Sequence, residues 1–235
     1  MSFATHLLDG FDWTTPFIAD ACTALQLPVR SGPPGLKPIV VGLKVAGRVC
    51  PAHHAGSVDV FLEAVALASA GDVLVIDNTG RLDEGCIGDL VAGEAHMAGL
   101  AGIVVWGAHR DTAAIQSIGI PVWSLGTYPV GPQELRSRSR HALEAATVGR
   151  ATVTRDEVVF ADDDGVVFVS AADSARVIAS ARDIAAREQA QAARLTQGAL
   201  LRTQLDLEAY LAKRRDDPDH TFRDHLRARG GAIEI

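Results

Sequence analysis

The sequence lacks the cysteine patterns, long apolar runs and signal segments that mark several large classes of protein. It has only three cysteines, widely spaced and without a CxxC pair. We therefore expect neither a zinc knuckle nor a redox dithiol, and this usage fits a reducing compartment. No apolar run approaches the roughly 20 residues that a membrane-spanning helix needs, and the N-terminus has no basic stretch followed by an apolar one. We expect a cytoplasmic protein that does not bind membranes.

A concentrated positive charge and the common nucleotide-binding motifs are also missing. The formal net charge is −7, and phosphate binding needs a positive surface, so we expect no nucleic-acid partner. One dense basic cluster, Arg136, Arg138, Arg140 and His141, has no aromatic residues among its charges, and we interpret it as the solvated face of a helix. No P-loop, GxGxxG or GxSxG sequence occurs, so neither nucleotide binding nor a nucleophile elbow is supported.

What the sequence does contain is an alternation of strands and helices. Its 235 residues, 48% of them hydrophobic, can bury one full core. Apolar spacing predicts helices near 15–27, 58–70, 115–119, 173–195 and 198–215, and strands near 73–77, 103–106, 121–125, 152–154, 158–160 and 166–169. We expect residues 39–49 to form one long strand or a hairpin with a glycine bend. We expect a polar loop at 77–85 and a hairpin turn at 162–165. This order is typical of an α/β core followed by a helical C-terminal arm.

The stretch 85–111 carries the densest set of candidate functional residues. It opens with a glycine-rich turn, residues 85–88, and continues with apolar residues near helical spacing. If a helix begins at Gly88-Asp89-Leu90-Val91, its first N–H groups lack helical partners and can hold a carboxylate or phosphate. The simpler alternative is that Gly88 permits a tight turn and Asp89 caps the helix. The spacing alone favours the simpler alternative.

Arg110 and Asp111 follow the apolar strand near 103–106 and a segment, 107–109, that we expect to be a loop. The fork of an arginine suits a carboxylate held by two hydrogen bonds. An aspartate can bind a hard metal ion such as magnesium, with water in the remaining positions. The alternative is a surface ion pair at the end of a strand, which contributes little stability. Position alone favours the ion pair.

Three further groups are weaker candidates. Asp162-Asp163-Asp164-Gly165 lacks the spacing and closing Glu of a calcium loop, so a hairpin turn is favoured. His53 and His54 would point to opposite faces of a strand, and we interpret them as polar loop residues. Cys86 shows no sequence feature that would activate its thiol.

Five short motifs in combination resemble the RraA-like family. They are, in the family's order and spacing, residues 71–77, Gly88-Asp89-Leu90-Val91, Gly107-Ala108-His109-Arg110-Asp111, Gly119-Ile120-Pro121-Val122 and residues 161–166. The resemblance covers roughly residues 15–185. That family includes the regulator of ribonuclease activity A and class II pyruvate aldolases acting on 4-hydroxy-4-methyl-2-oxoglutarate and 4-carboxy-4-hydroxy-2-oxoadipate. The resemblance reverses the preference for the cap and the ion pair.

The resemblance implies a swivelling β/α fold, assembled as a homotrimer or a pair of trimers with sites between subunits. It implies that Gly88, Asp89, Leu90 and Val91 bind the substrate through their backbone. Arg110 would hold the substrate, and Asp111 would ligate Mg²⁺ or Mn²⁺. We expect Arg110 and Asp89 to be catalytic, with Asp89 orienting a water molecule.

The activity implied is that of a carbon–carbon lyase, a divalent-metal-dependent pyruvate aldolase acting on a small 4-hydroxy-2-keto diacid. Oxaloacetate decarboxylation is an expected side activity, because both reactions pass through pyruvate enolate. Two alternatives stay open: a non-catalytic protein that docks on a ribonuclease, and a related lyase or dehydratase on a sugar acid. Because regulators need no metal site, the Arg110-Asp111 pair favours the enzyme.

The chain also departs from the family's usual pattern. Trp106 and His109 replace an acidic and a small apolar residue, and Asn78-Thr79 stands where many members have glycines. These changes should reshape the pocket. We expect residues 1–185 to form the catalytic domain and residues 186–235 to form a helical arm that clasps the oligomer. The alternative is that the tail, near Glu234, reaches a neighbour's pocket.

Overall fold

One eight-stranded sheet organises the body of the protein. The computed structural model describes residues 8–229, and the strand order is β1-β10-β9-β3-β4-β5-β6-β2. The strands of this sheet are β1 Arg30–Ser31, β2 Lys37–Pro38, β3 Val45–His53, β4 Val73–Ile87, β5 Gly102–His109, β6 Val122–Ser124, β9 Glu157–Ala161 and β10 Val166–Ser170. A separate hairpin consists of β7 Ala145–Val148 and β8 Ala151–Thr154. The helices are α2 Thr15–Ala24, α3 Asp59–Leu67, α4 Asp89–Met97, α5 Thr112–Ile118, α6 Ser174–Thr196, α7 Leu201–Gln204, α8 Leu207–Asp216 and α9 Phe222–Ala228.

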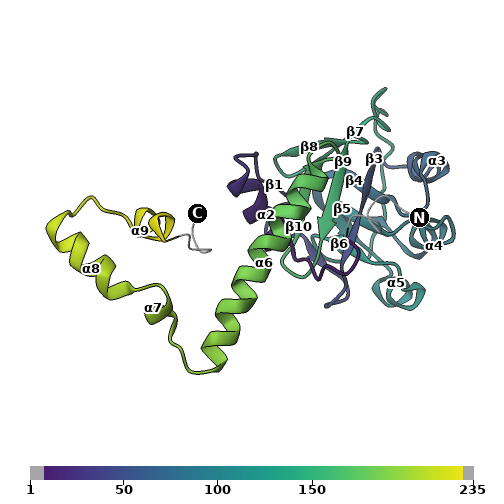
Figure 1. Cartoon of the computed structure of the whole chain (residues 1–235). Coiled ribbons are helices and arrows are strands. Elements are labelled where there is room, and N and C mark those ends of the chain that lie inside the picture. Colours follow the sequence, from purple (N-terminus) through teal and green to yellow (C-terminus); the bar gives the residue numbers. More distant parts are fainter. Residues whose placement is uncertain (1–7, 230–235) are drawn as a thin grey trace.

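The centre of the sheet is parallel and buried on both faces. Strands β3, β4, β5 and β6 pair in parallel, which explains why 73–76 and 103–105 are continuous apolar runs. Leu74 and Ile76 pack in one core cluster with side chains of α3, α4 and α5, which lie together beside the sheet in Figure 1. Val73 and Val75 face the opposite way and pack with the β7–β8 hairpin. The α/β core predicted from the sequence is therefore confirmed.

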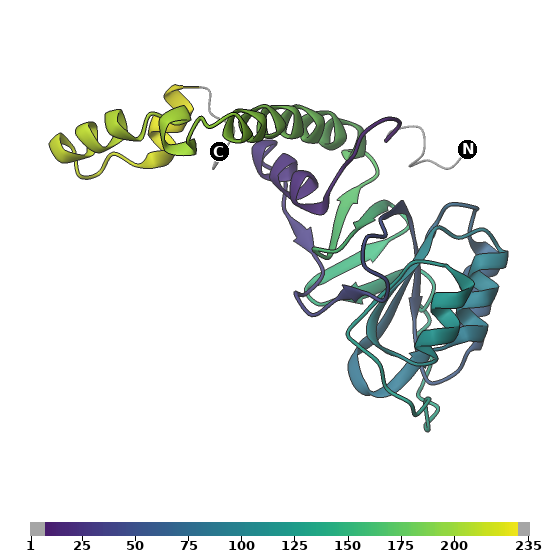
Figure 2. The same cartoon turned by 90° about the horizontal axis from the view of Figure 1, so that it is seen from below.

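A second layer forms where α2 and α6 cover the β9–β10 hairpin. Figure 2 shows these two helices side by side, and their apolar residues share a cluster with Phe160 and Val167. Helix α2 begins as predicted, with the side chain of Thr14 accepting a hydrogen bond from Phe17 N and Pro16 in the first turn. The turn at 162–165 joins the antiparallel strands β9 and β10, which confirms the predicted hairpin.

The predicted polar loop at 77–85 is wrong, because β4 continues through it to Ile87. Its pairing with β5 shifts register three times between Asp77 and Ile87. These irregularities let Leu82 and Asp83 project into solvent while the backbone stays paired. The exposed residues of this irregular stretch are mostly polar, which is why the sequence looked like that of a loop. The expected loop at 107–109 is likewise part of β5, which ends at His109.

Three other predictions are wrong in part. Residues 39–49 form neither one strand nor a hairpin, because the chain turns at Gly42, whose φ is +87°, and β3 begins only at Val45 and pairs with β4 and β9. His53 is the last residue of β3, whereas His54 follows the strand, as expected of a loop residue, but is buried. The basic cluster at 136–141 forms no helix; Arg138 instead pairs with Asp59 and Glu63 on α3.

The C-terminal arm extends away from the body beyond α6 (Figures 1 and 2). Helix α6 is the long helix predicted, and Gly198, with φ +91°, follows its end. The single helix expected after it is two, α7 and α8, and α9 was not predicted. The arm has its own small cluster. The rings of Tyr210 and Phe222 pack edge to face with their centroids 4.9 Å apart, and Nε2 of His225 lies 2.8 Å from Leu205 O in a hydrogen bond. Glu234 lies outside the described residues.

No helix within residues 8–229 combines the length and apolar character that crossing a membrane would require.

Asp162 provides a test of how α2 is attached to the sheet. Its buried carboxylate accepts hydrogen bonds from Thr15 N at 2.7 Å and Thr15 Oγ1 at 2.6 Å. Asp162→Ala leaves both donors without a partner and should lower the free energy of unfolding by about 1.5–3 kcal/mol. The control, Asp164→Ala, removes an exposed carboxylate of the same turn and should change it by less than about 0.5 kcal/mol. Equal urea-unfolding midpoints for the two variants would contradict this role.

Candidate active site

Strand β4 delivers the glycine turn to the start of α4. Ile87 is its last residue, Gly88 is the N-cap, and α4 begins at Asp89. The predicted helix start is therefore confirmed. Gly88 has no side chain to cap the helix, and the carboxylate of Asp89 accepts a hydrogen bond from Leu90 N at 2.8 Å. The N–H groups of the first turn are oriented as an anion site requires.

Strand β5 brings Arg110 and Asp111 to the same edge. Arg110 N donates to Ile87 O at 2.9 Å, so the ends of β4 and β5 are joined directly beside the glycine turn. Arg110 Nε lies 3.3 Å from Asp111 Oδ2, and the two side chains are 46% and 39% exposed. Asp111 is the N-cap of α5 in a left-handed conformation, with φ 58° and ψ 38°. Aspartate and asparagine are among the few residues other than glycine that adopt it readily.

Three glycines leave the space that Arg110 and Asp111 occupy. A Cβ atom on Gly88 would overlap with Asp111 Oδ2 and would lie 3.2 Å from Arg110 Nε. On Gly85 it would lie 2.9 Å from Arg110 Cβ, and on Gly131 it would lie 2.7 Å from Arg110 Nη1. The φ of Gly88 is −138°, which any residue adopts. Close approach, and not backbone conformation, therefore explains the glycine at position 88.

A cavity of about 320 Å³ joins these elements. Its lining includes all the predicted substrate-binding residues, namely Gly88, Asp89, Leu90, Val91 and Arg110. Asp111 does not line it, although the carboxylate lies against Gly88 at its edge. Leu90 is 83% exposed at the rim, whereas Val91 is buried. The arrangement offers a small anionic ligand one cation and the first turn of α4, where Leu90 N is already bound to the Asp89 carboxylate, with the carboxylate of Asp111 adjacent.

Another part of the cavity wall consists of His54 and Cys86, which were weaker candidates in the sequence, and of Phe61, which was not a candidate. The ring of His54 stacks on Phe61 at 5.0 Å, and its Nδ1 lies 2.9 Å from Asn78 Oδ1. The signal was present, because His54 follows β3 directly and the carboxyl ends of parallel strands meet at one edge. Burial lowers the pKa of His54, and burial raises that of the Cys86 thiol.

A buried ion pair supports that wall from behind. Glu84 is 2% exposed, and its two carboxylate oxygens accept from Arg136 at 2.9 and 3.2 Å. Burial alone would raise the pKa of Glu84, but the Arg136 guanidinium outweighs it and the pKa is lowered. Arg136 N also donates to Ala55 O at 2.8 Å. The irregular segment around Arg136 is thereby fixed against the ends of β3 and β4.

His109 lies outside the cavity lining but supports the turn that carries Asp111. It is buried, with Nδ1 2.7 Å from Ser124 Oγ and Nε2 2.8 Å from Thr112 Oγ1. Burial lowers its pKa. The departure from the family pattern at position 109 therefore changes a support of the site and not the cavity surface.

The donor set suits a hard metal ion better than a soft one. No group of three or more His, Cys, Asp or Glu side chains lies together within residues 8–229. What the site offers is the carboxylate of Asp111, 39% exposed beside the space left by Gly88, and the carboxylate of Asp89 in the cavity lining. Magnesium binds through one or two carboxylates and keeps several waters, so this donor set fits it.

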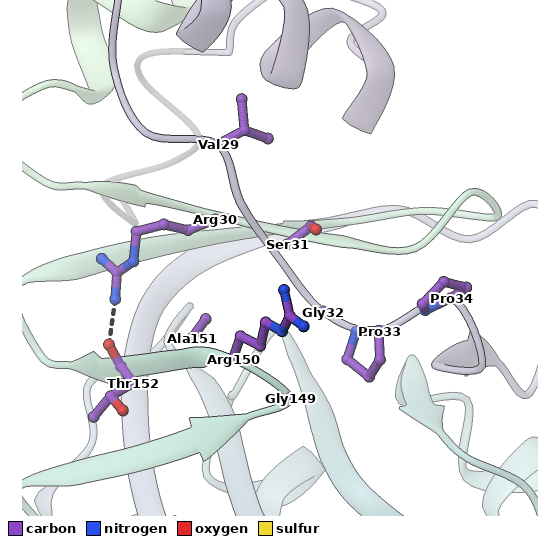
Figure 3. A pocket seen from close by; sticks show the side chains of 10 residues that line it. All are labelled: Val29, Arg30, Ser31, Gly32, Pro33, Pro34, Gly149, Arg150, Ala151 and Thr152. Atoms are coloured by element: carbon purple, nitrogen blue, oxygen red, sulfur yellow. Dashed lines mark hydrogen bonds between the residues drawn. The ribbon is translucent and has the colours of Figure 1, made fainter.

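A larger cavity, of about 410 Å³, lies elsewhere, between the segment around β1 and the β7–β8 turn (Figure 3). Its two arginines are Arg30 and Arg150, and Figure 3 marks the hydrogen bond from Arg30 to Thr152 O. Arg30 also pairs with Glu157 at 2.8 Å. The lining contains no His, Cys, Asp or Glu side chain. It offers no group that could transfer a proton, so the candidate active site is the smaller cavity.

Comparison with known proteins identifies the family. The RraA-like model, described as Aldolase/RraA, matches residues 15–168, which is more than half of the chain. The chain belongs to the RraA-like family. Its members include aldolases and ribonuclease inhibitors. The match spans the whole candidate site and ends before α6, so the arm lies outside the part of the chain that defines the family.

Solved structures share the fold. An uncharacterized protein of Pseudomonas syringae aligns with a TM-score of 0.72 and 21% identity over 86% of this chain and 97% of its own. The Streptomyces coelicolor protein RraAS2, described as an unusual member of the RNase ES inhibitor RraA family, aligns with a TM-score of 0.68 and 24% identity over 83% of this chain and 98% of its own. RraA of Thermus thermophilus, described as an RNA-processing inhibitor, aligns with a TM-score of 0.56 and 24% identity over 64% of this chain and 91% of its own.

The space beside Gly88 can be tested with a matched pair of glycines. Gly88→Ala forces Asp111 or Arg110 to move, but both side chains are half-exposed and can shift, so we expect a loss of no more than about 1 kcal/mol in unfolding free energy. Gly93→Ala, in the middle of α4 with its nearest neighbour Ile118 Cδ1 at 4.0 Å, should be neutral or up to about 1 kcal/mol stabilising. Chemical denaturation measures both. A Gly88→Ala protein as stable as the Gly93→Ala protein would show that the close approach is not a constraint.

Proposed function

We propose that this RraA-like protein is a divalent-metal-dependent pyruvate aldolase that cleaves a small 4-hydroxy-2-keto diacid, such as 4-hydroxy-4-methyl-2-oxoglutarate. The observation that carries the proposal is the single cavity lined by residues 88–91 and Arg110, with the Asp111 carboxylate beside it. A volume of about 320 Å³ suits a small organic acid. An apolar ligand would leave these charged and polar groups without partners.

Each residue has a role that follows from its chemistry. The guanidinium of Arg110 binds a substrate carboxylate through paired hydrogen bonds. The first N–H groups of α4 donate hydrogen bonds to the negatively charged keto-acid end of the substrate, and the helix dipole adds to this attraction. Asp89, at the cavity wall, orients a water molecule toward the substrate. Asp111 would hold Mg²⁺ or Mn²⁺, and such an ion, when bound, supplies positive charge that stabilises an enolate.

The reaction requires the bond between C3 and C4 of the substrate to break. The C4 hydroxyl loses its proton, the C4 carbonyl forms, and the bond's electrons pass into pyruvate enolate. Preorganised donors are most effective where negative charge develops, and here they are the α4 N–H groups and Arg110. Decarboxylation of oxaloacetate yields the same enolate, so the same groups would promote it.

The arm beyond residue 185 has a separate role in this proposal. It contains a small cluster of its own around Tyr210 and Phe222 and lies away from the body (Figure 1). We assign residues 186–235 to clasping a second copy within a trimer or hexamer. The aldolase body is then residues 1–185.

A second candidate is a non-catalytic inhibitor that docks on a ribonuclease. The likeness to RraAS2 and to the Thermus thermophilus RraA favours it, because both are described as inhibitors. The two functions differ in what they require of Asp111, since docking on a protein does not need a metal-binding carboxylate.

Oxaloacetate distinguishes these candidates. We expect the purified protein to release pyruvate from oxaloacetate with magnesium present and to stop when excess chelator is added. Asp111→Asn keeps a residue that tolerates the left-handed conformation, so it should remain folded yet lose at least about 100-fold in turnover. Asp83→Asn, which removes an exposed carboxylate of β4, is the control. Pyruvate release that the chelator and Asp111→Asn leave unchanged would sink the metal-dependent mechanism.

Arg110 should act on substrate binding. We expect Arg110→Ala to raise KM for oxaloacetate by about 10-fold or more, since a charge-assisted bidentate contact contributes about 1.5–3 kcal/mol. Magnesium binding, measured by titration calorimetry, should stay within twofold. Arg140→Ala removes an exposed cation outside the cavity and should leave both quantities unchanged. If Arg110→Ala kept the wild-type KM, the arginine would be structural only.

A further inference from the structure

The cavity that Arg110 lines also contains a histidine that the proposed function does not yet use. His54 is 3% exposed, and it lines the same cavity as Gly88 and Arg110. It comes from the end of β3, whereas the other residues come from the ends of β4 and β5 and the start of α4. Three adjacent parallel strands thus supply different groups to one cavity, at the edge where α/β proteins bind ligands.

The hydrogen bonds behind the ring fix its tautomer. His54 Nδ1 lies 2.9 Å from Asn78 Oδ1, and Arg136 Nη2 approaches the same oxygen at 3.4 Å. Arg136 can only donate, so the Asn78 atom that faces both groups is the carbonyl oxygen and not the amide nitrogen. An oxygen acceptor requires Nδ1 of His54 to carry the hydrogen. In the neutral ring the lone pair is therefore on Nε2.

Nε2 of His54 has no hydrogen-bond partner within residues 8–229, where the hydrogen-bond, ion-pair and stacking partners of the ring are Asn78, Glu84 and Phe61. The side chain is 1% exposed. The fully buried side-chain polar atoms without a partner, in the same range, are Asn78 Nδ2 and His220 Nε2. Nε2 of His54 is not one of them, so the small exposure of this ring, in a residue that lines the cavity, includes Nε2.

We propose that His54 is the proton acceptor and donor of the reaction in this cavity, acting through Nε2. The inference rests on the proposed aldolase function. Nε2 takes the proton of the C4 hydroxyl as the bond between C3 and C4 breaks and the C4 carbonyl forms. The same proton is then delivered to C3 of the enolate, which gives pyruvate and returns the ring to its neutral form. With oxaloacetate, whose cleavage releases carbon dioxide, only the second transfer is needed, and the proton comes from water through the same ring.

Glu84 provides the partner that a charged intermediate ring needs. Its Oε1 lies 3.6 Å from Nδ1 of His54, and it is held in place by the two hydrogen bonds to Arg136. A carboxylate behind the imidazole stabilises the imidazolium during proton transfer and keeps its orientation. Phe61, stacked on the ring at 5.0 Å, restricts rotation. A histidine that was only a packing residue would not require Nε2 to be free.

Two substitutions separate proton transfer from structure. Asn at position 54 places an amide N–H where Nδ1 was, so His54→Asn keeps the bond to Asn78 and removes Nε2; His54→Gln places its amide near Nε2 instead. The matched control is His53→Asn, because His53 bonds to Asp77 through Nδ1 at 3.1 Å and does not line the cavity. The assays are magnesium-dependent pyruvate release from oxaloacetate and incorporation of deuterium into the methyl group of pyruvate in D₂O.

We expect His54→Asn and His54→Gln to lower kcat about 100-fold or more, with KM changed less than about threefold, because general acid–base catalysis contributes factors of this size. Deuterium incorporation should fall in parallel, and His53→Asn should match the wild type in both assays. Circular dichroism establishes which variants are folded, and either folded variant suffices. An active wild type with fully active His54 variants overturns this inference and leaves the aldolase function standing. A wild type that is inactive in both assays overturns the aldolase function and this inference with it.

Discussion

The pairing of β4 with β5 is the interaction on which the site depends. It begins as a regular parallel ladder and continues, through three shifts of register, until Ile87 lies opposite His109. The hydrogen bond from Arg110 N to Ile87 O then closes the end of the ladder. Without this extension, Gly88 and Arg110 would lie on separate loops. The irregular part of the strand therefore performs the positioning that loops perform in many α/β proteins.

Burial follows from the same pairing. The regular part of β4 is covered by helices on one face and the β7–β8 hairpin on the other, and its side chains are wholly apolar. Between residues 79 and 83 the strand leaves this cover, so polar residues can occupy it. Asn78 and Glu84 are polar and yet buried. Arg136 approaches Glu84 from the segment after β6 and satisfies its charge. A buried carboxylate of this kind is stable only while its partner is in place.

Much of this could be predicted from the sequence. The apolar runs at 73–76 and 103–106 reveal buried parallel strands, and the proline and threonine at 14–16 mark the start of α2. The family resemblance brings Gly88 and Arg110 into one site, and the structure places both on one cavity. His54 was set aside as a loop residue, because the contacts that hold its ring, to Phe61 on α3 and to Asn78 and Glu84 on β4, do not show in the pattern of one strand. Alternation within one strand cannot reveal contacts made between strands. Helix α9 was missed for a different reason: its Thr221–Asp224 capping box is a local signal, but no long apolar stripe follows it.

The left-handed backbone of Asp111 has a consequence for the range of residues that this position can accept. A side chain that branches or extends at Cβ is disfavoured there by roughly 1–2 kcal/mol, which leaves glycine, asparagine and aspartate as the residues of lowest cost. Of these three, only aspartate carries a charge. A half-exposed position at the start of a short helix would ordinarily tolerate most of the twenty amino acids. Here the backbone adds a cost to most substitutions before any chemistry is considered, so this position tolerates fewer residues than its exposure alone would allow.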